Sequence, residues 1–308
     1  MLKFAVVRED FAVEAALVDA VKPSACLTVA SGGCTALALK HACPSLDVHA
    51  FDLNPDQLAH ARKKADAIAD GALARLNVDT ADEAGLSQCG EFEKLFRVLR
   101  FAWQQFIAPG DELETFFTVD DTTRTQLCSK WSASPSWPAI FEVAFAEGLL
   151  HAMFGPDATR HAARGSYPAY FQRVFERGLA QHDAAANPWL QHVLVQRYLT
   201  PAPFLTCHRR LDVSWHLGSL GDVPALERFG VVSLSNVFDW SDASLVTAWA
   251  DALKATQPGT LVVWRQLNNQ RDWRPLFEGF EEVPTLSERC TAMERALFYE
   301  RVTVMRRR

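Results

Sequence analysis

The sequence predicts an α/β fold in which one mostly parallel sheet is interrupted once by a long helical insertion. Residues 25–60 contain an apolar run, a turn of small residues, a helix-like segment and a second apolar run. Residues 71–210 hold many helix-like segments but almost no strand-like alternation, and strand patterns return in residues 211–308. Apolar runs that alternate with amphipathic helices are typical of a parallel sheet covered by helices.

The α/β pattern begins with a helix and a strand. Residues 10–21 have helical spacing, and Asp10 is the predicted N-cap of this helix. The apolar run 26–30 predicts the first strand. Five small residues, Ser31-Gly32-Gly33-Cys34-Thr35, then form a turn into the next helix-like segment.

A second strand and helix follow directly. The apolar run 48–51 ends in Asp52, and residues 54–69 have a helical period with Pro55 at the first helical position. The order strand, helix, strand, helix completes the first half of the sheet domain.

The middle of the chain is predicted to be an all-helical insertion, residues 71–210. Proline and glycine separate its helix-like segments, which are 92–106, 111–117, 137–153, 167–180 and 188–198. The ligand crevice of an α/β sheet lies at the carboxyl ends of its strands, so an insertion at this point can cover the crevice as a lid.

The last third of the chain predicts the rest of the same sheet. Its expected elements are strands at 211–217, 231–235 and 260–265, a helix at 242–256, and a final antiparallel strand at 297–305. The sheet domain therefore comprises residues 1–70 and 211–308.

Composition excludes several classes of protein. The chain has 308 residues and a formal charge of -6, which argues against a nucleic-acid partner. Its seven cysteines include no CxxC pair, so we expect a reducing compartment, the cytoplasm, and no structural zinc or other metal. No stretch approaches 18 uncharged apolar residues, so neither export nor a membrane span is expected.

The turn at residues 31–35 and Asp52 together predict a nucleotide site. Glycines allow close backbone approach, a helix N-terminus offers free N–H groups, and an acid about 20 residues on can bind a ribose diol. Only Gly32 and Gly33 are present of the three glycines that a dinucleotide fingerprint needs, which favours S-adenosylmethionine over NAD or FAD. The alternative is an ordinary turn in which Asp52 merely precedes a helix.

Several segments resemble a known family. They are VREDF (7–11), LTVASGGCTAL (27–37), AFDLNPDQL (50–58), GLSQCGEFEKLF (85–96), NPWLQHVLVQRY (187–198), VSLSNVFDW (232–240) and ERALFYERV (294–302). With these segments the chain resembles the bacterial S-adenosylmethionine:diacylglycerol 3-amino-3-carboxypropyltransferases of betaine-lipid synthesis and their wider domain family of unknown function.

The resemblance implies a Rossmann-like class I S-adenosylmethionine-dependent methyltransferase fold with a large helical lid. It also implies that S-adenosylmethionine is a substrate cut at the γ-carbon of its methionyl chain, with release of methylthioadenosine. Holding a nucleophile near that carbon, rather than near the methyl group, would decide the reaction.

Eight residues are expected to contact S-adenosylmethionine. Asp52 is assigned to the ribose, and Arg8 to the methionyl carboxylate, since a guanidinium pairs with a carboxylate through two hydrogen bonds. Ser219 and Asp222 follow the third strand, where this fold meets adenine, although they also suit a simple turn. The full set is Arg8, Ser31, Gly32, Gly33, Asp52, Ser219, Asp222 and Ser235.

Four further residues are candidates for catalysis. Asn236 and Asp239 follow the fourth strand, and Asp239 is the candidate general base, with capping of the next helix as the alternative. Asn187 and Tyr198 come from a family-like segment of the insertion. An aromatic ring facing the cleft would stabilise a sulfonium by a cation–π contact.

The second substrate and the partners are left open. The acceptor is a lipid-type or small-molecule hydroxyl or amine, or the substrate's own amine closes on itself to give azetidine-2-carboxylate. Methyl transfer and non-catalytic binding are further alternatives. Residues 127–141 contain one basic residue, Lys130, so membrane contact is expected only if the acceptor is a lipid. The oligomeric state is not predicted.

Overall fold

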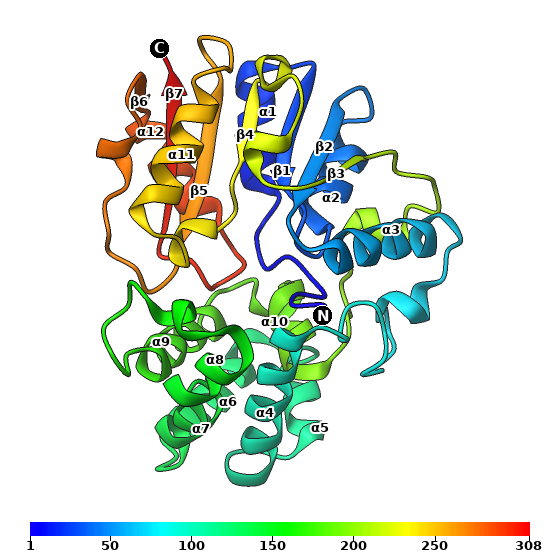
Figure 1. Cartoon of the computed structure of the whole chain (residues 1–308). Coiled ribbons are helices and arrows are strands. Elements are labelled where there is room, and N and C mark those ends of the chain that lie inside the picture. Colours follow the sequence, from blue (N-terminus) through cyan, green and yellow to red (C-terminus); the bar gives the residue numbers. More distant parts are fainter.

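The computed structural model describes residues 1–308 and contains a seven-stranded sheet with a helical insertion (Figure 1). The strand order is β3-β2-β1-β4-β5-β7-β6. The first five strands are mutually parallel, β7 is antiparallel to β5, and β6 is antiparallel to β7. The strands are β1 (Ala25–Val29), β2 (Asp47–Asp52), β3 (Ser214–Leu217), β4 (Val231–Ser233), β5 (Leu261–Gln266), β6 (Phe280–Glu282) and β7 (Arg301–Arg307). The predicted α/β architecture is confirmed.

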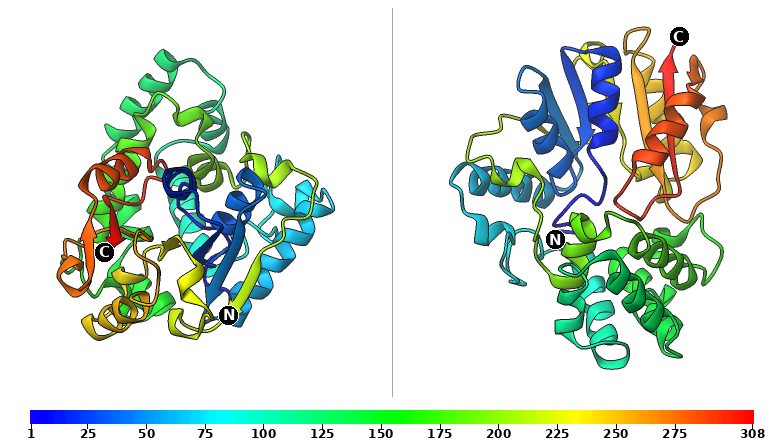
Figure 2. Two further views of the ribbon diagram at one scale, coloured as in Figure 1. Left: turned by 90° about the horizontal axis from the view of Figure 1, so that it is seen from above. Right: turned by 180° about the vertical axis from the view of Figure 1, so that it is seen from behind.

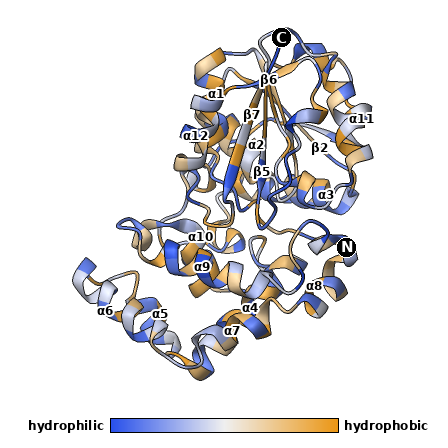
Figure 3. Cartoon of the chain, turned by 90° about the vertical axis from the view of Figure 1, so that its left-hand side faces the viewer, coloured by the Kyte–Doolittle hydropathy of each residue, from blue (hydrophilic) through white to orange (hydrophobic).

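Helices cover both faces of this sheet. α1 (Ala12–Val21), α2 (Cys34–Ala42) and α12 (Pro284–Met293) contribute to the apolar core on one face, and α11 (Ala243–Leu253) contributes to the core on the other. α3 (Pro55–Ala69) packs beside β2 and β3. Figure 3 shows hydrophobic residues along the strands between these helical layers. The central strands β1, β4 and β5 are buried on both faces, as expected for a parallel sheet.

The insertion has an aromatic core of its own. Its helices are α4 (Glu91–Phe106), α5 (Gly110–Thr115), α6 (Asp121–Ser132), α7 (Trp137–Ala144), α8 (Glu147–Phe154), α9 (Tyr167–Leu179) and α10 (Pro188–Val195). Trp103 packs edge-on against Trp131 and Trp137 at the centre of this core. The two chain segments that lead into and out of the insertion pair at a bridge between Val78 and Tyr198.

The structure corrects several predicted elements. The single helix expected at 137–153 is two helices, because the chain turns out of helical geometry at Phe145 and Ala146. α6 was not predicted because it is mostly polar and buries only Arg124 and Trp131. β6 and α12 were also missed, and the last strand begins at Arg301 rather than at residue 297.

The N-terminal segment, residues 1–10, crosses the carboxyl ends of the strands. It lies at the junction between the sheet domain and the insertion in the views of Figures 1 and 2. Gln57 hydrogen-bonds the backbone of Lys3 and Phe4, and the buried Lys64 ammonium donates to the carbonyl oxygens of Ala5 (2.6 Å) and Gly32 (2.8 Å). This segment therefore contributes to any site at the carboxyl ends of the strands.

Gly32 is where this segment approaches the turn after β1 most closely. A Cβ atom at Gly32 would lie 2.7 Å from the Val6 Cα and 2.8 Å from the Ala5 carbonyl oxygen. We expect Gly32→Ala to lower the free energy of unfolding by about 1–3 kcal/mol, because backbone atoms must move apart. Gly148→Ala is the control, since that position in α8 is open and alanine favours a helix. Equal denaturation midpoints for Gly32→Ala and the wild type would contradict the close packing.

No helix of this structure combines the length and the apolar character needed to cross a lipid bilayer.

Candidate active site

Two adjoining cavities lie where β1, β2 and β4 end. We call them the outer cavity, which reaches Asp52 and Trp249, and the inner cavity, which reaches Arg8, Glu9 and Asp239. The two cavities share six lining residues, which are Phe4, Ser31, Phe154, Ser235, Asn236 and Trp240. β1 and β4 are neighbours at the point where the strand order reverses, which is where open α/β sheets bind ligands.

Asp52 ends β2 and faces the outer cavity. Its Oδ2 accepts the N–H of Ser31 at 3.0 Å and its Oδ1 accepts the N–H of Asn54 at 2.9 Å, which fixes the carboxylate. Burial raises the pKa of Asp52, and these two backbone bonds oppose the rise. Each oxygen retains acceptor capacity for a ligand hydroxyl. The N-cap of α3 is Asn54, so Asp52 is not needed to cap that helix.

The two glycines of the turn serve the packing of the protein rather than the lining of a cavity. Gly33 has φ +79, and a Cβ there would lie 2.7 Å from the Ala61 Cβ on α3, while Gly32 packs against Val6 as described above. Neither glycine lines the outer or the inner cavity, whereas Ser31 lines both. The two glycines allow a close approach, as the motif predicts, but the approaching atoms belong to Ala5, Val6 and Ala61 of the protein.

Asp239 lies at the inner cavity in the segment after β4. It is only 3% exposed, and its carboxylate accepts hydrogen bonds from the backbone N–H of Leu267 (3.0 Å) and the side-chain amides of Asn269 (3.0 Å) and Asn236 (3.3 Å). Burial raises the pKa of Asp239 to about 7. A carboxylate with a pKa near neutrality suits a general base. The predicted alternative was that the segment 239–242 caps the next helix; Asp242 is the residue that does so, which leaves the Asp239 carboxylate without a capping role in α11.

Arg8 also lines the inner cavity, but part of its guanidinium is already paired. Its Nη1 is 2.9 Å from Glu93 Oε1, and the guanidinium carbon lies 4.4 Å from the centre of the Phe96 ring. The buried Nε has no hydrogen-bond partner. One N–H of Arg8 therefore has no partner within the protein.

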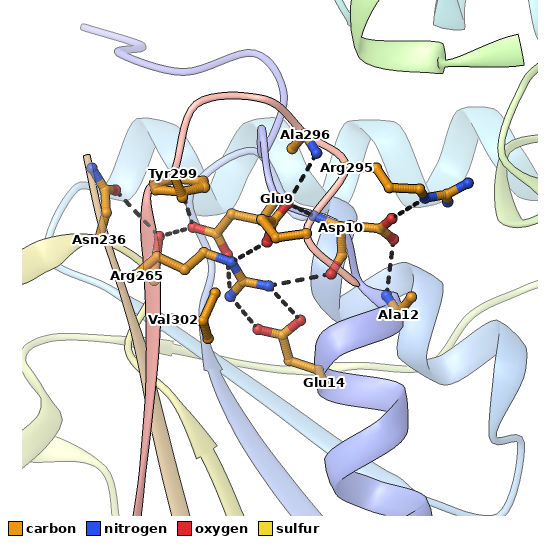
Figure 4. A network of polar contacts seen from close by, with 12 residues as sticks. Glu9, Asp10, Ala12, Glu14, Asn236, Arg265, Arg295, Ala296, Tyr299 and Val302 are labelled. Carbon is orange, nitrogen blue, oxygen red and sulfur yellow. Dashed lines mark hydrogen bonds and ion pairs between the residues drawn. The ribbon is translucent and has the colours of Figure 1, made fainter. Parts of the chain in front are cut away.

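Glu9 and Tyr299 are site residues that the sequence analysis did not identify. Both line the inner cavity, and the Glu9 carboxylate accepts hydrogen bonds from the hydroxyls of Ser235 and Tyr299 (Figure 4). Glu9 follows Arg8 in a charged trio that reads as an ordinary helix start. Its partner Arg265 follows four apolar residues in the buried strand β5, and this buried charge is the signal in the sequence that points to Glu9 and Tyr299.

Other predicted residues have structural roles. Asn187 is the N-cap of α10, where its Oδ1 accepts the N–H groups of Trp189 and Leu190 and its amide donates to the Arg295 carbonyl. Ser219 and Asp222 close a turn after β3, with the Ser219 N–H 2.8 Å from Asp222 Oδ2. None of these three residues lines the outer or the inner cavity.

Tyr198 lies at the neck of the insertion and not at the two cavities. It lines a third cavity, which shares Val7 and Glu9 with the inner cavity. Its ring centre is 5.3 Å from that of His192, and burial raises the pKa of its hydroxyl. Tyr198 was expected to be a catalytic residue, but it does not line the inner cavity, where Asp239 lies.

The rest of the inner cavity is mainly apolar. The insertion contributes aromatic side chains to it, including Phe92, Phe154, Tyr167 and Phe171, and the segment before β7 contributes Phe298. No group of three or more His, Cys, Asp or Glu side chains is arranged to hold a metal ion. The inner cavity is thus an apolar chamber with a few polar groups at the edge of the sheet.

Comparison of the chain with known protein families and with curated proteins found no match in either.

Proposed function

We propose that this chain binds S-adenosylmethionine as a substrate across the two cavities and directs attack at its methionyl γ-carbon, releasing methylthioadenosine. The observation that carries the proposal is the position of two carboxylates, the half-buried Asp52 and the buried Asp239. Asp52 lies in the outer cavity and Asp239 in the inner cavity, and six shared lining residues join the cavities. The proposed fold is the Rossmann-like class I S-adenosylmethionine-dependent methyltransferase fold with a helical lid, and the family-like segments support it.

The outer cavity suits the adenosine part. Asp52 is positioned to accept hydrogen bonds from two ribose hydroxyls, one at each carboxylate oxygen. Phe51, Leu53 and Trp249 provide apolar walls for the adenine ring. A two-hydroxyl contact to one fixed carboxylate distinguishes a ribose from a deoxyribose.

The inner cavity suits the methionyl end and the reaction. An N–H or O–H nucleophile attacks the γ-carbon, the bond from that carbon to sulfur breaks, and its electron pair returns to sulfur as the neutral thioether of methylthioadenosine. The nucleophile's proton passes to the ionised carboxylate of Asp239. The apolar wall from the insertion limits water, which competes as a nucleophile.

Cyclisation is the second candidate, and the largely apolar lining of the inner cavity, which offers little to bind a polar acceptor, favours it. In this version the substrate's own α-amine attacks its γ-carbon, giving azetidine-2-carboxylate without a second substrate. The ammonium has a reference pKa of about 8 and must first lose a proton, which Asp239 can accept.

The products formed from S-adenosylmethionine alone test this proposal. Methylthioadenosine with a cyclic amino acid supports cyclisation. Methylthioadenosine that forms only after addition of a water-soluble amine or of diacylglycerol vesicles supports transfer to that acceptor. S-adenosylhomocysteine would show methyl transfer instead, and binding without any product would show a non-catalytic protein. Both of the last two results contradict the proposal.

A further inference from the structure

A buried charge cluster adjoins the inner cavity. Three carboxylates, those of Glu9, Glu14 and Glu294, converge on the single guanidinium of Arg265 (Figure 4). Arg265 Nη1 is 3.2 Å from Glu9 Oε2 and 2.5 Å from Glu14 Oε1, and its Nε is 2.6 Å from Glu294 Oε2. All four side chains are almost completely buried.

The cluster contains more acids than bases. The nearby Arg295 is paired with Asp10, so Arg295 does not neutralise the other carboxylates. An unpaired carboxylate in the interior is costly, and it takes up a proton or a cationic partner. In accord with this, burial raises the pKa of Glu294 to about 7 and also raises the pKa of Glu9, although Arg265 opposes both shifts.

Glu9 is the member of the cluster that faces a ligand cavity. It lines the inner cavity, whereas Glu14 and Glu294 line neither the inner nor the outer cavity. Arg8 precedes it on the same segment, and its buried Nε has no partner, as noted above. Glu9 shares the Arg265 guanidinium with two other carboxylates, so the cavity is lined by a member of a cluster with more acids than bases, next to Arg8, whose Nε has no partner.

We propose that the inner cavity is a site for the α-amino acid end of a cationic ligand, in which Glu9 pairs with the ammonium and Arg8 Nε donates to the carboxylate. This inference rests on the proposed function and adds the residue that selects the ligand's charge. S-adenosylmethionine carries a sulfonium, an ammonium and a carboxylate, so its net charge of about +1 at neutral pH offsets the surplus acid. The Phe298 and Tyr299 rings provide further cation–π partners at the same wall.

The first part of the test uses the wild-type chain alone. The groups that face Glu9 are Arg265, Glu14, Glu294, Ser235, Tyr299 and, across the cavity, Arg8 and Asp239. Because the surplus acid holds a proton in the free protein, S-adenosylmethionine should displace a proton on binding at pH 6.5. Methylthioadenosine, which has no amino acid end, should displace none. Calorimetric titrations in two buffers of different ionisation enthalpy measure this difference, and equal proton release for both ligands would overturn the inference.

The second part uses Glu9→Gln, with methylthioadenosine affinity as the check that the variant is folded. The preference for S-adenosylmethionine over methylthioadenosine should fall roughly ten- to hundredfold, as expected for loss of a charged hydrogen bond. Glu14→Gln is the matched control, because it removes the same charge from the cluster without facing the cavity, and should retain the preference within about threefold. An unchanged preference in Glu9→Gln overturns the inference and leaves the proposed function standing. A wild type that binds neither ligand overturns both.

Discussion

Replacing Asp239 by Asn should lower the rate of methylthioadenosine formation roughly 10²- to 10⁴-fold, the usual contribution of a general base. Asparagine retains the shape but has one acceptor oxygen, so it keeps only one of the two bonds from Leu267 and Asn269, which reach different carboxylate oxygens, and it cannot take up the proton of the nucleophile. Substrate affinity should change little, since Asp52 and the outer cavity are untouched. Single-turnover kinetics separate the two effects.

The same substitution should remove a pH dependence. With the pKa of Asp239 at about 7, the wild-type rate should rise as the pH passes 7 and the carboxylate ionises. Asp242→Asn is the control, because Asp242 caps α11 and lines neither cavity. A wild-type pH profile preserved in Asp239→Asn would show that another group is the base.

The stability of the fold should change with pH in the opposite sense to the activity. The pKa of Asp239 is raised from 3.8 to about 7, so between these values the folded chain holds a proton that the unfolded chain has lost. The contribution of Asp239 to the free energy of unfolding therefore falls as the pH rises from 4 to 7, by up to about 1.4 kcal/mol per unit, and is constant above. Denaturation of Asp239→Asn should lack this part of the slope.

Replacing Asp52 by Ala should weaken the binding of both S-adenosylmethionine and methylthioadenosine, roughly ten- to hundredfold. Both molecules contain the ribose that Asp52 is proposed to bind, so the preference between them should stay the same. This pattern is the reverse of that expected for Glu9→Gln, which should affect only the ligand with an amino acid end. Calorimetry with the two ligands measures both patterns.

Two further variants show whether the loss of affinity in Asp52→Ala comes from the missing ribose contact or from a disturbed turn. Asp52→Asn keeps an acceptor for one of the N–H groups of Ser31 and Asn54, and it should lose affinity even where the turn is intact. Asp56→Ala removes a nearby acid that lines neither cavity and should bind both ligands as the wild type does. Unaltered affinity in Asp52→Ala would show that the ribose lies elsewhere.

The sheet could be predicted because its local patterns are strong. Apolar runs followed by small or polar residues mark β1, β2, β4 and β5, and all of these strands were found. Polar residues directly after these apolar runs were also the basis for most of the predicted site residues. Ser31, Asp52, Ser235, Asn236 and Asp239 each line at least one of the two cavities, and so does Arg8, which the family-like segment predicted rather than a strand end.

The other predicted site residues lie away from the two cavities, and in each case the local motif has two physical uses. A glycine pair suits either a ligand or a crossing backbone, and only the position of Val6, 26 residues earlier, decides between them. Asn187 and the pair Ser219 and Asp222 satisfy helix and turn N–H groups, which their residue types serve equally well. Glu9 was missed because its partner Arg265 is far away in sequence, and only folding brings the two charges together.

A structure of the chain in complex with S-adenosylmethionine tests the central claim most directly. We expect the ribose hydroxyls within hydrogen-bond distance of the Asp52 carboxylate and the methionyl γ-carbon in the inner cavity, on the side of Asp239. A complex with the methyl group facing Asp239, or with the nucleoside outside the outer cavity, would contradict it.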